Sequence, residues 1–323
     1  ASPYRGILVY HGLGSGKTCT AIAASEALYG VANKKIVVMT PFSLRPNFIR
    51  EITFCGFRHF STMNYWVQYP LVKRRLQRDE KGKLVEKFTT HKHVDLYARF
   101  VLSLSDTYMA KLYANKLPLW IPDFTKVANF NDESQITPAQ RDQIRAQIND
   151  SINNRITFIN YNGVRKEQLK AWACERKTTG KTIFDDAVIV VDEIHNLIRL
   201  IQGSMIPFLQ EKEGSKRKRK IPAEPIQPAL CNQSLNYNRA FLFYRLLVGA
   251  KNSKIIGLSG TPIINFPEEL AILSNVLGGY IDVFEVLISG ADSKKVADLT
   301  KIMNADLRTD LVIISPVQGG YSV

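Results

Sequence analysis

The chain has 323 residues, 45% of them hydrophobic and 22% charged, which is typical of a globular protein with a substantial buried core. No apolar run reaches the roughly 18 residues that a membrane span needs, and the first residues lack the order of a secretory signal, so no membrane contact is expected. The net charge of +14 favours a polyanionic partner, most simply nucleic acid, although it would also suit solubility or a fragment whose acidic part lies elsewhere.

The N-terminal segment predicts alternating strands and helices. Gly6–Tyr10 has the continuous apolar character of a buried strand, a helix is expected over Lys17–Tyr29 with Gly30 ending it, and Ile36–Met39 predicts a second buried strand. A further helix is expected over Arg45–Phe54. This alternation implies parallel strands joined by crossover helices. Because the first strand begins so early, we expect a chain trimmed from a longer protein.

The region from about 57 to 181 is less regular. Val72–Lys87 is strongly charged and predicts a solvated excursion, while Asp95–Asn115 has helical character. Thr137 followed by Pro138 predicts a helix start, with threonine as the cap and proline at the first position, and this helix should continue to about Asn153.

The second half returns to strands and helices, and Ala187–Val191 is its strongest strand. The unbroken apolar character of that strand suits the centre of a parallel sheet. The other expectations are strands at Ile156–Ile159 and Lys254–Leu258, helices at Arg165–Arg176, Asn238–Gly249 and Glu268–Leu277, the last ended by Gly278 and Gly279, a basic loop at Glu211–Pro228, and an ambiguous tail from Arg308.

The first motif with chemical meaning is His11-Gly12-Leu13-Gly14-Ser15-Gly16-Lys17-Thr18, between an expected strand and an expected helix. Glycines allow close backbone approach and positive φ, and the start of a helix attracts phosphate. Lys17 has the position to reach the β and γ phosphates of a nucleotide, and Thr18 to bind Mg²⁺. His11 departs from the usual G-x-x-x-x-G-K-[ST]. The alternative is a chance glycine-rich turn, which the flanking elements disfavour.

The second motif is Val191-Asp192-Glu193-Ile194-His195, at the end of the strongest strand. Two adjacent carboxylates there are costly without a purpose. Asp192 is expected to hold Mg²⁺ through water, and Glu193 to orient and deprotonate an attacking water. Taken alone, the pair could equally be the acidic start of a helix, but the phosphate loop favours catalysis.

The third motif is Leu258-Ser259-Gly260-Thr261-Pro262, again after an apolar strand. Small hydroxyl residues at this position can bond the acidic pair and sense the γ-phosphate. An ordinary strand-to-helix turn explains them equally well in isolation.

The ordered motifs GSGKT, DExH and SGTP resemble motifs I, II and III of superfamily 2 helicases and translocases, and Thr40–Asn47 resembles their motif Ia, which contacts the nucleic-acid backbone. SGTP followed by Ile263-Ile264-Asn265 is closest to Snf2-like members. Ser2–Gly6 together with HGLGSGKT and DEIHN resembles the helicase-like ATPases of large nucleocytoplasmic DNA viruses, the group of poxvirus nucleoside triphosphatase I and the early transcription factor small subunit.

This resemblance implies an α/β fold, a RecA-like P-loop domain whose parallel sheet is flanked by helices, with ATP and Mg²⁺ as cofactors. It places the loop from His11 to Thr18 at the nucleotide, with Gly14, Gly16, Lys17 and Thr18 on the phosphates. Asp192 becomes the Mg²⁺ organiser and Glu193 the catalytic base.

The resemblance also implies that His195 couples the ATP site to Ser259, Gly260 and Thr261. Without the motif, a local cap or core histidine would be the preferred interpretation of His195. The resemblance also places Thr40, Pro41 and Arg45 near the nucleic-acid track.

One departure from the family concerns arginines. The second motor domain of the family should supply them in a Q-x-x-R-x-x-R-like segment, and none follows the third motif. Gln140–Arg145 has both residue types but precedes the second motif, so we interpret it as a surface helix. Because such arginines speed hydrolysis by about 10³–10⁵-fold, we expect this chain alone to bind ATP weakly and hydrolyse it slowly.

The expected domain boundaries follow from the motifs. Residues 1–56 and 156–290 should form the two parts of one RecA-like domain. Residues 57–155 should form an inserted helical or irregular region, and residues 291–323 the start of a linker or a following domain.

Other candidate sites are weaker. Lys216–Lys220 could bind nucleic acid, direct nuclear import or be a solvated loop. His91-Lys92-His93 has no partner ligands for a metal and is interpreted as a surface feature. Tyr65, Trp66 and Tyr69 could stack on bases, yet most aromatic residues at this spacing belong to a core.

The cysteines bear on location. Cys19, Cys55, Cys174 and Cys231 lie far apart without a CxxC pair, which predicts neither a zinc site nor a disulfide framework. A reducing intracellular compartment fits best, namely the host cytoplasm or the virion for a viral protein.

Three functions remain open at this point. The first is an ATP-dependent helicase or translocase on DNA or RNA, acting in viral transcription with RNA polymerase or other transcription machinery. The second is an ATP-gated transcription-complex factor that does not unwind strands. The third is another P-loop enzyme such as a small-molecule kinase, which would leave DExH and SGTP unexplained.

Overall fold

The centre of the molecule is a five-stranded parallel sheet with the strand order β1-β9-β8-β2-β7. The computed structural model describes residues 5–12, 14–32, 34–78, 84–209, 239–262, 267–279, 287–289, 293–306, 312–317 and 320–322. The strands of the sheet are β1 (Gly6–Tyr10), β2 (Lys35–Met39), β7 (Ile156–Ile159), β8 (Ala187–Val191) and β9 (Lys254–Ser259). β8 lies at the centre, as its unbroken apolar sequence predicts.

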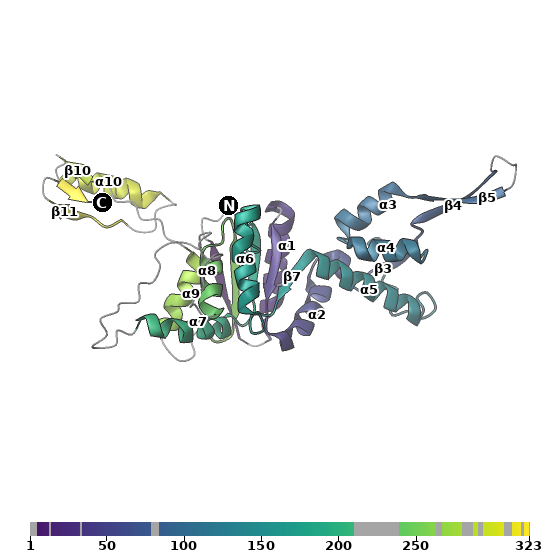
Figure 1. Cartoon of the computed structure of the whole chain (residues 1–323), viewed down its shortest axis with the longest axis horizontal. Coiled ribbons are helices and arrows are strands. Elements are labelled where there is room, and N and C mark those ends of the chain that lie inside the picture. The colour runs from purple at the N-terminus through teal and green to yellow at the C-terminus, as the bar shows by residue number, and fades with distance from the viewer. Residues whose placement is uncertain are drawn as a thin grey trace.

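Helices cover both faces of this sheet and confirm the expected α/β, RecA-like fold (Figure 1). Alternate residues of β2 belong to different cores: Ile36 and Val38 pack with one set of helices, and Val37 and Met39 with the other. The first set is α1 (Lys17–Ala32), α2 (Arg45–Cys55) and α5 (Pro138–Arg155). The second is α6 (Lys166–Thr179), α7 (Ile194–Leu209), α8 (Arg239–Val248) and α9 (Glu268–Gly278).

Residues between α2 and α5, here called the inserted body, extend beside the sheet, and some of them, such as Trp66 and Trp120, share the core of one sheet face (Figure 1). The inserted body also has its own apolar core, which includes Leu71, Met109 and Leu119. Its elements are β3 (Tyr65–Tyr69), β4 (Val72–Arg78), β5 (Leu84–Thr90), α3 (Lys92–Leu96), a π-helical turn (Tyr97–Val101), α4 (Asp106–Ala114) and β6 (Leu119–Asp123). β3 pairs with β6 and β4 with β5, both antiparallel.

Several local expectations are corrected in this region and its neighbours. The charged segment Val72–Lys87 contains two paired strands, and the helix expected over Asp95–Asn115 breaks where Ser103 adopts a φ of +55°. α1 continues through Gly30 to Ala32. A 3₁₀ turn (Phe42–Leu44) precedes α2. α7 directly follows the second motif, so the acidic pair also precedes a helix, as its alternative interpretation expected.

Helix boundaries with a clear chemical signal agree with expectation. Thr137 accepts a hydrogen bond from the backbone N–H of Gln140, whose side chain bonds back to Thr137, a complete capping box. Gly279 ends α9 with a φ of +82°, which favours glycine. The expected loop at 211–228 lies outside the described residues.

A small C-terminal unit follows α9. It consists of β10 (Leu287–Ser289), α10 (Ser293–Ala305), β11 (Ser315–Val317) and β12 (Gly320–Ser322). Its three strands form an antiparallel sheet in the order β10-β12-β11. None of the helices in the described part of the chain is long and apolar enough to cross a membrane.

A buried ion pair joins the end of α5 to α1. Arg155 at the end of α5 pairs with Glu26 of α1, and its guanidinium lies 3.9 Å from the Tyr29 ring centroid and 4.4 Å from that of Phe57. Burial raises the pKa of Glu26, and the charge of Arg155 opposes that rise. Removing either partner would therefore leave a poorly compensated buried charge.

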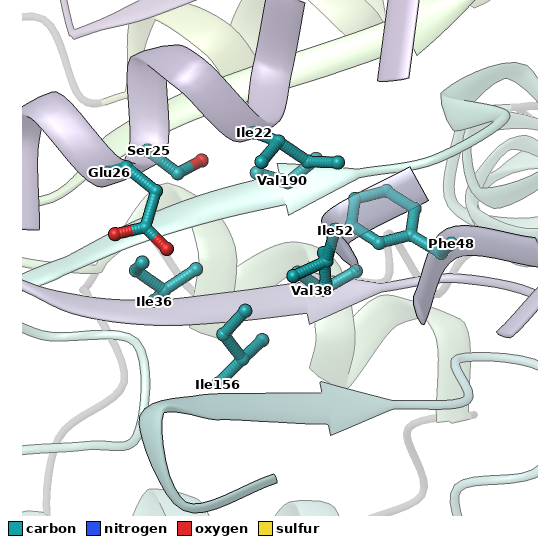
Figure 2. A pocket seen from close by; sticks show the side chains of 9 residues that line it. All are labelled: Ile22, Ser25, Glu26, Ile36, Val38, Phe48, Ile52, Ile156 and Val190. Atoms are coloured by element: carbon teal, nitrogen blue, oxygen red, sulfur yellow. The ribbon is translucent and has the colours of Figure 1, made fainter. Parts of the chain in front are cut away.

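A small cavity beside Glu26 lies between α1 and the sheet (Figure 2). Its volume of about 10 Å³ is small enough to admit one water molecule at most. It is therefore a packing gap and has no room for a nucleotide. Its walls are Ile22, Ser25, Glu26, Ile36, Val38, Phe48, Ile52, Ile156 and Val190.

Cys19 of α1 and Cys55 of α2 form a disulfide, with Cα atoms 5.6 Å apart. The expectation of unpaired cysteines is wrong, because residues distant in sequence meet where α1 packs on α2. Cys174 is also disulfide-bonded, and Cys231 lies outside the described residues. The cysteines thus give no support to the expected reducing compartment.

The Cys19–Cys55 bond should stabilise the fold by about 2–4 kcal/mol, because it closes a loop with a sequence separation of 36. We expect the double variant Cys19→Ser, Cys55→Ser to lose that much free energy of unfolding in urea without reductant. After full reduction, wild type and variant should become nearly equal. Equal stability before reduction would show that the bond does not form in solution.

Candidate nucleotide-binding site

The order of the strands brings the three sequence motifs to one edge of the sheet. The phosphate loop follows β1, the acidic pair follows β8, and the third motif ends β9, which lies between those two strands. Because these strands are parallel, their carboxyl ends share an edge, the usual place for ligands in open α/β sheets.

The phosphate loop has the backbone of an anion cradle. Gly14 and Gly16 have φ values of +78° and +82°, conformations that a side chain would strain. A Cβ added at Gly12, Gly14 or Gly16 would meet no atom within 4 Å, so the space over the loop is open. Ser15 Oγ donates to the Gly12 carbonyl over 2.7 Å and helps to hold the loop. Leu13 lies outside the described residues.

Lys17 connects the loop to the third motif. Its ammonium donates to the His11 carbonyl oxygen over 3.0 Å. A Cβ on Gly260 would lie 3.3 Å from Lys17 Nζ, so a larger residue at 260 would displace the lysine. Thr18 is half-buried in the first turn of α1. The loop, the lysine and the third motif therefore meet at the open cradle.

Asp192 is a largely buried carboxylate. Its backbone N–H donates to Met39 over 2.8 Å, and its side chain accepts from the Thr40 hydroxyl over 3.1 Å. Burial raises the pKa of Asp192, while the hydrogen bond from Thr40 and the charge of Lys17 oppose the rise. A carboxylate at this position suits Mg²⁺, a hard ion that prefers oxygen ligands.

Glu193 has a strained backbone that a neighbouring tyrosine supports. Its φ of +48° is unusual for a residue with a side chain, and such conformations gather at functional sites. The hydroxyl of fully buried Tyr161 lies 3.2 Å from the Asp192 carbonyl oxygen and 3.3 Å from that of Glu193, and it donates to them. Tyr161 therefore supports the backbone turn that carries Glu193.

Tyr161 was absent from the sequence-based candidates. The available signal was its position: it closely follows β7, the neighbour of β2, as Asp192 follows β8. Polar residues that follow a strand become sequence-based candidates only where they belong to a known motif, and Tyr161 belongs to none.

His195 links the second motif to the third. Its Nδ1 is 2.9 Å from Ser259 Oγ and 3.4 Å from Glu193 Oε2, and Ser259 Oγ also accepts the N–H of Thr261 over 3.0 Å. Burial lowers the pKa of His195, which favours a neutral imidazole near pH 7. The contact expected between the two motifs is thus present as a hydrogen bond.

The residues expected near a nucleic-acid track have varied surroundings. Thr40 is buried with its hydroxyl on Asp192, and Pro41 begins the turn after β2. Arg45 bonds the Asn153 side chain over 3.2 Å and lies over the ring of Phe158. Next to them, Phe42 is 73% exposed. Nucleic-acid contact by this segment stays a prediction.

The weaker candidates are placed as follows. Trp66 is buried, Tyr65 lies near the Lys126 ammonium, and Tyr69 packs edge-on against His91. Gln140–Arg145 lies on α5, where Ile144 points into the core and Arg141 pairs with Glu133. The basic segment 216–220 lies outside the described residues.

Fold and site together define a RecA-like α/β protein that carries a phosphate loop at the carboxyl ends of its parallel strands. The chain is similar to a protein of Acanthamoeba polyphaga mimivirus that carries the provisional name ATP-dependent RNA helicase R563. The two are 30% identical over 119 residues, which are 33% of this chain and 20% of the relative. The chain thus spans about a fifth of that relative's length. No family model matches the chain. These findings support a helicase-like relationship.

If Glu193 acts in ATP hydrolysis, removing the Tyr161 hydroxyl should slow turnover with little effect on nucleotide binding. A hydrogen bond of about 1 kcal/mol corresponds to roughly fivefold in rate, so we expect Tyr161→Phe to lower kcat for ATP hydrolysis by about 3–10-fold with KM nearly unchanged. The matched control is Tyr113→Phe, which removes a tyrosine hydroxyl bonded over 2.8 Å to Asp95 in the inserted body. Equal kcat values for both variants would exclude this role.

The lowered pKa of His195 should make the fold less stable in acid. Below the ordinary histidine pKa of about 6.5, the unfolded chain takes up a proton that folded His195 resists, so stability is present above this pH and lost as pH falls. We expect the Tm of wild type to fall more steeply than that of His195→Gln between pH 7.5 and 5.5. Parallel curves would show that His195 does not contribute.

Proposed function

We propose that this chain is the ATP-binding domain of a superfamily 2 helicase or translocase that hydrolyses ATP and acts on DNA or RNA. The observation that carries the proposal is the hydrogen bond of 2.9 Å between His195 and Ser259, which joins the DExH motif to the SGTP turn beside Lys17. A small-molecule kinase has no need for this connection between motifs. The net charge of +14 and the helicase-like relative also support a polyanionic partner.

The residues at the sheet edge suit the chemistry of hydrolysis. The open cradle and Lys17 would hold the triphosphate, with the ammonium opposite the β and γ phosphates. The carboxylate of Glu193 would take a proton from the attacking water as the bond between the γ-phosphorus and the leaving oxygen of ADP breaks. Asp192 and Thr18 would hold Mg²⁺, which offsets negative charge on the phosphates when bound.

The Ser259 turn would report the state of the phosphates. Ser259 Oγ bonds both the His195 ring and the Thr261 N–H, while Gly260 lies against Lys17. Loss of the γ-phosphate would change the position of the lysine and the carboxylate together. The turn would then transmit that change to a domain or partner that packs against this edge of the sheet.

The finer assignments are further parts of this proposal. SGTP supports a Snf2-like member, and the local sequence together with the viral source of the relative supports a helicase-like ATPase of a large DNA virus. In that setting we propose a role in viral transcription, with RNA polymerase or other transcription machinery as a partner. A second RecA-like domain with arginines would complete the ATP site.

Two substitutions separate binding from turnover. Lys17→Ala should weaken binding of a fluorescent ATP analogue by tenfold or more, because it removes the cation beside the phosphates. Glu193→Gln should bind the analogue as wild type does and lower hydrolysis by at least 100-fold, because an amide cannot accept the proton. Unchanged hydrolysis in Glu193→Gln would remove this residue from catalysis.

The motor assignment is tested with nucleic acid. We expect single-stranded or duplex DNA or RNA to raise the ATPase rate of the full-length protein, and failure of all four to do so would contradict the proposal. A strand-displacement assay then separates its versions. Robust unwinding favours a helicase, whereas stimulated hydrolysis without unwinding favours a translocase or an ATP-gated transcription factor.

A further inference from the structure

Two sulfur atoms and a carboxylate meet where α1 packs on α2. They belong to Cys19, Glu51 and Cys55, and one ligand atom from each residue lies within 4.8 Å of the other two. Within the described residues, no other group of three or more histidine, cysteine, aspartate or glutamate side chains is close enough to share a metal ion. All three side chains are partly buried, so the cluster is within reach of ions and of small reductants.

The positions of the three residues on their helices explain why they meet. Glu51 and Cys55 are four residues apart on α2, so both lie on the same face of that helix. Cys19 lies in the first turn of α1 and is bonded to Cys55 across the contact between the helices. Two ligands one turn apart on a helix also occur in the zinc motif HExxH. The sequence separation of 36 between the cysteines hides this cluster from spacing patterns such as CxxC.

The distances in the cluster fit a tetrahedral zinc ion. Zinc binds cysteine sulfur at about 2.3 Å and carboxylate oxygen at about 2.0–2.2 Å, and tetrahedral angles then place the two ligand atoms about 3.6 Å apart. Cys19 Sγ and Glu51 Oε2 are 3.5 Å apart. The carboxylate therefore already stands where an oxygen ligand would lie beside a zinc-bound Cys19.

Glu51 has no cationic partner among the described residues. None of the ion pairs in that part of the chain includes it. The Cys19 sulfur beside it carries no proton while it is bonded to Cys55, so it cannot donate to the carboxylate. After cleavage of the disulfide, a divalent cation between the three ligand atoms would offset the charge of the carboxylate and of both thiolates.

The disulfide must be cleaved before a metal can bind, because the thiolate is the form of cysteine that coordinates metals. A reductant of the dithiol class would attack one sulfur, form a mixed disulfide and release the other cysteine, then leave as its own disulfide. Two electrons and two protons thus pass from the dithiol to Cys19 and Cys55. Zn²⁺ would then displace the two thiol protons to the solvent.

We propose that Cys19, Glu51 and Cys55 form a zinc site when their disulfide is reduced, with water as the fourth ligand. Thiolate ligands favour Zn²⁺ over Mg²⁺, which prefers oxygen. The ion would replace the covalent link between α1 and α2 with a coordinate link, one turn or less from Lys17 and Thr18. The inference goes beyond the proposed function and does not rest on it, because none of the three ligands belongs to the nucleotide site.

The first test is metal binding by the full chain in its two redox states. One sample is kept oxidised, and the other is reduced with a water-soluble phosphine and desalted without oxygen. Both are titrated with Co²⁺, whose thiolate complexes have a charge-transfer band in the near ultraviolet that oxygen ligands do not give, and Zn²⁺ is then added to displace it.

We expect the reduced chain to bind one Co²⁺ with this band and to exchange it for Zn²⁺. The oxidised chain should bind Zn²⁺ roughly 100-fold more weakly or less, because it has no thiolate to offer. Zinc should also raise the Tm of the reduced chain, since it binds the folded state, and leave that of the oxidised chain unchanged.

Substitutions then identify the ligands. Glu51→Gln should lower the zinc affinity of the reduced chain by about tenfold or more, since even outer-shell partners of a metal contribute that much. The matched control is Glu167→Gln, which changes an exposed glutamate of α6 and should bind as wild type does. Cys19→Ser should lose the cobalt–thiolate band although Cys174 and Cys231 are still thiols, whereas Cys174→Ser should keep it.

Three results would overturn the inference. Reduced wild type without a cobalt–thiolate band would show that no thiolate site forms. Equal zinc affinity of the oxidised and reduced chains would show that the metal binds elsewhere. Wild-type affinity in Glu51→Gln would remove the carboxylate from the site. None of these results bears on ATP binding, so the proposed function is tested separately.

Discussion

Parallel alignment of β1, β9, β8 and β2 is the constraint on which the candidate site depends. Each strand ends at the same edge, so four short segments that are remote in sequence become neighbours without long connecting loops. β9 is decisive, because it separates β1 from β8 and places Ser259 between the phosphate loop and the acidic pair. A shift of β9 by one residue would turn Ser259 to the other face of the sheet and break its bond to His195.

The site also carries costs that its surroundings offset. Burial disfavours the charged form of Asp192, and the positive φ of Glu193 costs about 1–3 kcal/mol. Hydrogen bonds from Thr40 and Tyr161 offset these costs, at about 1 kcal/mol each. The two supporting residues follow β2 and β7, so the two strands on one side of β8 support the acidic pair that follows it.

Sequence reasoning succeeded where a single segment carries its own signal. Apolar β8 and the capping box at Thr137 are examples, since burial and capping depend on residues within a few positions. It failed where the signal depends on a partner that the fold supplies. The charged β4–β5 hairpin needs its cross-strand register, the Cys19–Cys55 bond needs two packed helices, and the role of Tyr161 needs the neighbouring turn.

The junction between α5 and β7 has a mechanical consequence. α5 ends at Arg155 and β7 begins at Ile156, so an 18-residue helix about 27 Å long continues into the sheet without a flexible joint. Arg155 is further clamped by Glu26 and aromatic rings at this point. Because α5 also holds Ser105 through Asp150 and Trp120 through Gln147, any displacement of that region is coupled through one rigid helix to β7.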